Sequence, residues 1–216
     1  MQLLQDTWQY FVTHQAEFWA KTHTHLVLSG AALLIGITVG ITLGIMTSQS
    51  RSASLFVTNT VGAVRAIPSL AIMAVMLPII GIGFRPALIA LTILALPPII
   101  INTQAGFLSV DPAIVEAARG MGLSRRQIIG QVQFPLALPI IIAGVRIAAV
   151  EVLASATIGA IIGAGGLGEY VFSGLSLGPA YMYLMLVGAI TIAVITFTAE
   201  NVFNGLEALT RRAFYR

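Results

Sequence analysis

A glycine-rich segment carries the most familiar chemical pattern in this sequence. Gly163, Gly165 and Gly168 satisfy the pattern G-x-G-x-x-G, which holds a pyrophosphate in dinucleotide-binding folds. That function requires a β-strand before the glycines and a helix after them within a βαβ unit, and the apolar neighbours of this segment fit neither element. We therefore predict a glycine-rich loop whose backbone turns tightly, and no dinucleotide site.

Metal, thiol and nucleotide chemistry have little support in the sequence. Cysteine is absent, and His23 and His25 lie one residue apart without a nearby carboxylate or thiolate to complete a metal site. We expect these two residues and His14 to be ordinary amphipathic side chains at a membrane interface. The ATP-binding pattern G-x-x-x-x-G-K-[S/T] is also absent, so we expect this chain to bind no cofactor and to hydrolyse no ATP.

The remaining candidates for chemistry are charged residues that interrupt apolar runs, namely Arg65, Arg146, Glu151 and Glu200. Arg146 and Glu151 are five residues apart, about 140° around a helix, so they are not expected to pair with each other. A pair between Arg65 and Glu151 of neighbouring helices is allowed. Such pairs are more often structural than substrate-binding. No set of Asp, His or Ser residues suggests an enzyme, and Glu151 is the only deep carboxylate available to an ion-coupled secondary transporter.

The composition indicates which elements must hold these residues. Of the 216 residues, 57% are hydrophobic and only 9% are charged, and the mean hydropathy is +0.94. A soluble domain averages about 25% charged residues, so lipid must be the solvent around most of this chain. The apolar runs do not alternate with polar residues as the strands of a membrane β-barrel do, and helices are therefore predicted.

Five stretches are long enough to cross a bilayer as helices. They lie at about residues 25–47, 56–80, 86–106, 134–160 and 180–203. Prolines within or beside them are predicted to bend or interrupt the helices. These are Pro68, Pro78, Pro97, Pro98, Pro135 and Pro139. Glycines four residues apart in the first span, Gly36, Gly40 and Gly44, are predicted to form a ridge for close helix packing.

The basic residues predict the orientation, because short cytoplasmic loops collect Lys and Arg. Only Lys21 and Arg85 lie on one side of the predicted spans, and seven arginines lie on the other. The seven are Arg51, Arg119, Arg125, Arg126, Arg211, Arg212 and Arg216. The N-terminus is therefore predicted to lie outside and the C-terminus inside. This topology explains the pI of about 9.7 without any nucleic-acid partner.

The polar ends of the chain are predicted to be separate segments. Residues 1–24 contain several aromatic side chains and suit an arm at the membrane interface rather than a secretory signal. Residues 25–210 form the membrane domain, with a cytoplasmic loop at 111–131, and residues 211–216 form a basic cytoplasmic tail.

The loop at 111–131 has its own local structure. Asp111 is predicted to cap a helix that begins at Pro112, with Glu116 in its early turns. Gly120 and Gly122 end this helix, and Ser124 caps a second short helix. Two interpretations are open from the residues alone: an amphipathic connector on the lipid headgroups, or a projection that docks onto a cytoplasmic partner.

The residues of this loop resemble a known motif. Glu116-Ala117-Ala118 followed by Gly122, with Ile128 and Pro135 further on, is similar to the EAA loop of ABC importer permeases. Four further segments match in order and at the right spacing: Ile67-Pro68-Ser69-Leu70-Ala71, Asn102-Thr103, Val110-Asp111-Pro112 and Gly163–Gly168. Over about residues 25–210 the chain resembles the glycine betaine, carnitine and choline branch, the ProW and OpuCB type.

The resemblance implies a type I importer permease fold in the cell membrane, with the EAA loop as a coupling helix. It implies two permease subunits, identical or homologous, two cytoplasmic ATPases that bind ATP and Mg²⁺, and an external substrate-binding protein. The residues expected to couple to the ATPase are Asp111, Glu116, Ala117, Ala118, Arg119, Gly122, Leu123 and Arg125. Those expected along the translocation pathway are Pro68, Ser69, Asn102, Thr103 and Glu151. A methionine-type or other amino-acid permease of the same kind, and a secondary transporter, are the alternatives.

Overall fold

Long helices account for nearly all of the chain. The computed structural model describes residues 2–214, and none of them forms a β-strand. Within these described residues, four helical runs are long and apolar enough to cross a membrane, or five if a bent pair counts as one span. They are α2 (Gln15–Ser48), the bent pair α3 (Arg51–Arg65) and α4 (Ser69–Ile80), α5 (Phe84–Leu108), the run containing α8 (Phe134–Gly159) and the run containing α10 (Met182–Phe214). The predicted all-α membrane class is confirmed.

The second predicted span is not one straight helix. Within residues 56–80, α3 ends at Arg65 and α4 starts at Ser69, and the two helices meet at an angle of 89°. Pro68 lies at the break, with φ −57° and ψ 135°. Proline lacks an N–H and disfavours the helical conformation in the residue before it, which explains the break. Pro78, Pro97, Pro98 and Pro139, in contrast, lie inside helices.

The first span begins earlier than predicted. The N-terminal region breaks at His14, so that α1 (Gln2–Thr13) is a separate short helix, and α2 is continuous from Gln15 across the predicted boundary between residues 24 and 25. The sequence between Gln15 and residue 24 contains no glycine or proline to end the helix. At the other end of the chain, α10 runs through the predicted boundary at residue 211 to Phe214, and residues 215 and 216 of the predicted tail lie outside the described part.

Close contacts between backbones hold α2, α5 and α8 together. A Cβ atom on Gly40 would lie 2.8 Å from a side-chain carbon of Ile99, and one on Gly44 would lie 2.5 Å from Cβ of Thr103. Gly36 faces Ala95 in the same way. The predicted glycine ridge therefore packs against α5 of the same chain, where small residues allow the helices to approach.

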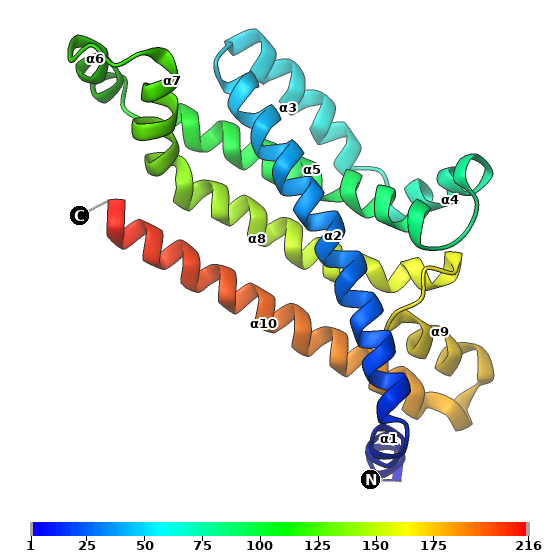
Figure 1. Cartoon of the computed structure of the whole chain (residues 1–216). Helices are drawn as coiled ribbons and strands as arrows, with labels where there is room; N and C mark the ends of the chain where they lie inside the picture. The colour runs from blue at the N-terminus through cyan, green and yellow to red at the C-terminus, as the bar shows by residue number, and fades with distance from the viewer. Residues whose placement is uncertain (1, 215–216) are drawn as a thin grey trace.

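The two ends of the molecule differ in charge as predicted. Figure 1 shows α6 (Pro112–Gly120), the turn between α2 and α3, and the C-terminal end of α10 toward one end of the molecule. This end carries the arginine-rich segments. At the opposite end lie α1 and α9 (Gly168–Leu177), a helix that the sequence analysis did not predict (Figure 1). The turn between α4 and α5 reaches the second end too, because Gly83 N donates a hydrogen bond of 2.7 Å to Ile162 O.

Candidate functional site

The loop between α5 and α8 begins with the helix that the sequence predicted. The side chain of Asp111 accepts a hydrogen bond of 2.8 Å from Ala113 N, and Pro112 is the first residue of α6. An aspartate cap satisfies a backbone N–H that the helix cannot satisfy itself, and proline at the first position loses no internal bond. Both predicted roles are confirmed.

The EAA residues end in a tight glycine turn. Leu123 N donates to Ala118 O (3.2 Å) and Gly122 N donates to Arg119 O (3.0 Å), which is the bonding pattern of a Schellman motif. Gly122 has φ +84°, in the left-handed region that favours glycine. The glycine four residues after Ala118 is therefore required by the backbone of this turn.

A second cap follows the glycine turn at once. Ser124 and Gln127 form a capping box, in which Ser124 N donates to Gln127 Oε1 at 2.8 Å. The short helix α7 (Arg125–Gln127) then continues through a π-helical turn, η1 (Ile128–Gln133), into α8. Ile128 is buried. The loop is thus a folded unit in which caps and turns connect α5 to α8.

The predicted coupling residues divide between an outer and an inner face of this unit. Glu116, Ala117 and Arg119 are exposed, and so is Asp111. Ala118 is only 2% exposed. Its small side chain allows α6 to lie close to the rest of the loop, while Glu116 and Ala117 remain available to another molecule.

Two hollows separate α6 from the membrane helices. One, of about 260 Å³, is lined by residues that include Arg119, Leu123 and Arg125, and the other, of about 370 Å³, extends to Glu116. Arg125 Nη2 donates to Gln49 Oε1 at 3.4 Å and so ties the loop to the C-terminal end of α2.

The five predicted pathway residues do not form one cluster. Pro68 and Ser69 lie at the bend between α3 and α4, and Arg65 at the end of α3 forms an ion pair with Glu151 of α8, with 3.2 Å between Nη2 and Oε1. This is the pairing between helices that the sequence allowed. Arg146 forms no pair with Glu151 and instead lies 3.6 Å from Glu207 of α10.

Asn102 and Thr103 lie elsewhere, in contacts between helices. A Cβ atom on Gly144 of α8 would lie 2.5 Å from Cβ of Asn102, whose side chain donates to Pro98 O at 2.8 Å. Thr103 is fully buried against Gly44 of α2. These two residues therefore pack helices together in this conformation, and their role as pathway residues stays a prediction.

A buried polar link near Thr103 was missed by the sequence analysis. Gln104 of α5 is 2% exposed, donates to Thr47 Oγ1 of α2 at 2.6 Å and accepts from Thr58 Oγ1 of α3 at 2.8 Å. The presence of a glutamine in the charge-free stretch 86–110 could have predicted this link, because a buried amide needs hydrogen-bond partners on other helices.

Ion pairs and aromatic rings join the helices at the outer end. Lys21 of α2 forms ion pairs with Glu169 of α9 and with Glu17, and its ammonium lies 5.1 Å from the centre of the Tyr170 ring. Burial raises the pKa of Tyr170, and the Glu17 carboxylate adds to this shift. Burial also raises the pKa of Tyr10, again with a contribution from Glu17.

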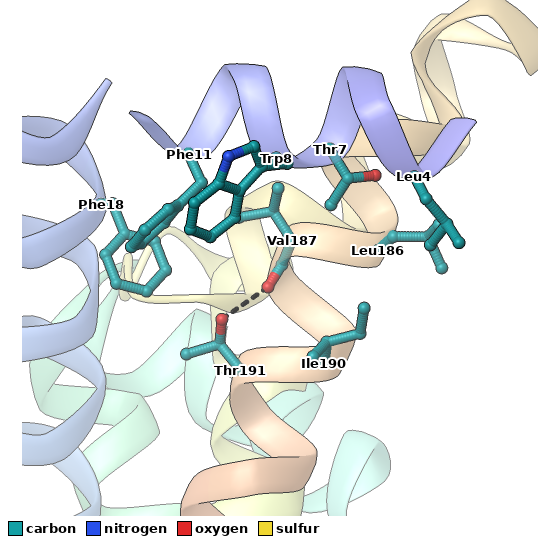
Figure 2. Close-up of a pocket in the computed structure, with 9 residues that line it drawn as sticks. All are labelled: Leu4, Thr7, Trp8, Phe11, Phe18, Leu186, Val187, Ile190 and Thr191. Atoms are coloured by element: carbon teal, nitrogen blue, oxygen red, sulfur yellow. Dashed lines mark hydrogen bonds between the residues drawn. The ribbon is translucent and has the colours of Figure 1, made fainter. Parts of the chain in front are cut away.

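An apolar pocket of about 280 Å³ separates α1 from α10 at this end. Figure 2 shows Trp8 of α1 beside Val187 of α10, with Phe11 of α1 and Phe18 of α2 grouped next to Trp8. The predicted interfacial arm is thus packed onto the membrane helices.

The histidines do not all lie at the surface. His25 is buried, and its Nε2 lies 3.1 Å from Leu153 O of α8. It therefore contributes to helix packing, whereas an interfacial side chain was expected. Among residues 2–214, no three His, Asp or Glu side chains are grouped so that they could hold a metal ion.

The glycine segment that resembled a dinucleotide motif is a turn. Gly163, Gly165 and Gly166 have positive φ values, and Gly168 starts α9. The tight turns predicted for this segment are confirmed, and α8 rather than a strand precedes them.

Comparison with known proteins agrees with this geometry. A family model described as "Binding-protein-dependent transport system inner membrane component" matches residues 36–212. The carnitine transport permease protein OpuCB of Listeria monocytogenes is 41% identical over 187 residues, which cover 87% of this chain and 85% of that protein. The glycine betaine/carnitine/choline transport system permease protein OpuCB of Bacillus subtilis (strain 168) is 35% identical over 196 residues, which cover 90% of this chain and 89% of that protein.

Among solved structures, a chain of the MetNI methionine ABC transporter in an inward-facing conformation superposes with a TM-score of 0.81 at 23% identity. The superposition covers 91% of this chain and 97% of that one. The predicted ABC importer permease fold is thereby confirmed. With a family match over most of its length and a capped, glycine-terminated helix in the predicted coupling loop, the chain belongs to the binding-protein-dependent transport system inner membrane components.

Proposed function

We propose that this chain is the permease subunit of an ABC importer for a small osmoprotectant with a trimethylammonium group, such as glycine betaine, carnitine or choline. The relatives at 41% and 35% identity support this substrate class, since they are named as permeases for carnitine and for glycine betaine, carnitine and choline. The likeness to the methionine transporter, at 23% identity, concerns the fold and does not favour a methionine substrate.

The geometry of α6 is the observation that supports the proposed coupling best. Glu116 and Ala117 are exposed on a helix that is fixed at one end by the Asp111 cap and at the other by the Gly122 turn. A helix held in this way is suited to enter a groove of a cytoplasmic partner and to move as a rigid body. Two ATPase subunits, one for each permease, would bind ATP and Mg²⁺ and displace α6 as they close.

The connections of α6 would transmit this displacement to the membrane helices. Residues 109–111 join α6 to α5, and the Gly122 turn, α7 and η1 join it to α8. Movement of α6 would therefore turn α5 and α8 and change the side to which the pathway opens. A second permease subunit would supply the other half of the pathway. An external binding protein would deliver the solute, and the aromatic cage that selects a quaternary ammonium group by cation–π attraction is expected there.

The test is ATP hydrolysis in lipid nanodiscs by this chain co-expressed with the ATPase and permease of its own system. We expect binding protein loaded with carnitine to stimulate hydrolysis, and Glu116→Lys to abolish the stimulation. Asp6→Lys, which makes the same change on the exposed surface of α1, is the matched control and should leave it intact. Carnitine uptake into liposomes that contain this chain alone, without ATPase, would contradict the proposal and identify a secondary transporter.

A further inference from the structure

The ion pair between Arg65 and Glu151 connects two of the predicted membrane spans. Arg65 is fourteen residues from the start of α3, about 21 Å along the helix, and Glu151 is eight residues, about 12 Å, from the end of α8. With the start of α3 at one face of the bilayer and the end of α8 at the other, both charges fall within a hydrocarbon layer of about 30 Å. Charged groups at such a depth face protein or water, because contact with lipid is costly.

The pair is not enclosed by its own chain. The side chain of Arg65 is 46% exposed and that of Glu151 is 32% exposed. On α8, the residues one turn to either side of Glu151, Ile147 and Ala154, are exposed as well. The bend at Pro68 turns α4 by 89° from the line of α3.

A second ion pair of α8 shows the contrast. Arg146, on another side of α8, lies 3.6 Å from Glu207 and donates to Asn204 Oδ1 at 2.5 Å, and the Glu207 side chain is only 14% exposed. That pair fastens α8 to α10. Arg65 and Glu151, in contrast, share one hydrogen bond and keep a large part of their side chains exposed, as a site for an incoming polar solute requires.

We propose that Arg65 and Glu151 form a zwitterion-selective site in the translocation pathway, facing water between two permease subunits. The idea rests on the proposed function and adds the groups that recognise the solute. Glu151 attracts the trimethylammonium group, which has no N–H and interacts through its charge alone. Arg65 donates hydrogen bonds to the carboxylate of a betaine. In the empty site the two side chains satisfy each other.

This arrangement separates solutes by their second charge. Glycine betaine and carnitine carry both a trimethylammonium group and a carboxylate, so they engage both residues. Choline carries a hydroxyl in place of the carboxylate and engages Glu151 only. Loss of the Arg65 charge should therefore harm the two zwitterions and largely spare choline, whereas loss of the Glu151 charge should harm all three.

The experiment measures ATP-driven uptake of labelled carnitine, glycine betaine and choline into proteoliposomes that contain the whole complex, each with its binding protein saturated. We expect Arg65→Gln to lower the carnitine-to-choline uptake ratio about tenfold, the effect of losing one charge-assisted hydrogen bond. Arg65→Lys keeps the charge and should restore most of the ratio. Arg146→Gln removes a charge from the second ion pair of α8 and should leave the ratio unchanged.

The outcomes distinguish this inference from the function on which it rests. If the wild-type complex takes up these solutes and Arg65→Gln leaves their ratio unchanged, or if Arg146→Gln shifts it equally, the pair is only structural and the inference is wrong. If the wild-type complex takes up none of the three solutes, the proposed function itself fails. ATP hydrolysis without binding protein, measured for each variant, shows whether the complex has assembled.

Discussion

Substitution of Gly122 by alanine tests how the backbone of the coupling loop is used. Gly122 has φ +84° and forms the left-handed turn of the Schellman motif after α6. A Cβ atom added there would meet no other atom within 4 Å, so crowding plays no part. The whole effect of Gly122→Ala must come from the cost of a left-handed conformation for alanine.

That cost is about 1–2 kcal/mol. The free loop of the variant can escape it by unwinding, but docking onto the ATPase restores the turn and the cost with it. We therefore expect the affinity of the permease for its ATPase to fall about 5- to 30-fold. ATP hydrolysis stimulated by loaded binding protein should fall with it at limiting ATPase concentrations.

The neighbouring glycine supplies a matched control. Gly120 also has open space around it, but it is the last residue of α6 and has no positive φ. Gly120→Ala should therefore be neutral or slightly favourable, since alanine is the better helix former. Affinity can be measured by titrating purified ATPase onto the permease in nanodiscs. Equal effects of the two substitutions, or no loss with Gly122→Ala, would refute the assignment of the turn as the element that fixes the coupling helix.

Two further substitutions test the packing that supports the site, both read out as thermal unfolding of the purified permease. Gly44→Ala places a Cβ atom 2.5 Å from Cβ of Thr103 and should destabilise the fold by about 1–3 kcal/mol. The control Gly30→Ala meets open space and should not destabilise it. Equal melting temperatures of the two variants would show that α2 and α5 can separate at little cost. Gln104→Leu leaves the Thr58 hydroxyl without its acceptor and should lower the stability by about 1–3 kcal/mol. The same change at the exposed Gln131 should be nearly neutral. A larger loss of stability with Gln131→Leu than with Gln104→Leu would show that Gln104 does not link α2, α3 and α5.

The coupling loop was predictable because its signals are local. Asp111, Pro112, Gly122 and Ser124 each act on the backbone within a few residues of themselves, so residue type and spacing suffice to place the caps and the turn. The same holds for Gly163, whose turn needs no distant partner.

Helix ends and bends were harder to predict. Hydropathy marks the part of a helix that crosses hydrocarbon, and α2 continues beyond that part through polar residues to Gln15. The span at 56–80 is long enough to cross a membrane as one helix, although Pro68 divides it. The helix α9 was missed because the glycines before it indicated a loop, although Glu169 in its first turn was a helix signal.

The orientation of Asn102 and Thr103 depends on contacts far away in the sequence. Gly144 of α8 makes room for one side chain and Gly44 of α2 for the other. No local sequence pattern indicates which face of α5 packs against which helix. Sequence reasoning placed both residues on the correct helix, and only the packed structure shows that they lie between helices.

The packing of the helices links the coupling loop to the proposed solute site. A Cβ atom on Gly106 of α5 would lie 3.0 Å from the Ala137 carbonyl of α8, so the two helices that carry α6 are in close backbone contact and should move together. Within the described chain α3 buries only Ser54, which leaves it more loosely held. The ion pair of Arg65 with Glu151 crosses from this loosely held helix to the α5 and α8 unit. Rotation of that unit by α6 would separate the two charges, so ATP-driven movement would break the zwitterion site and release the solute.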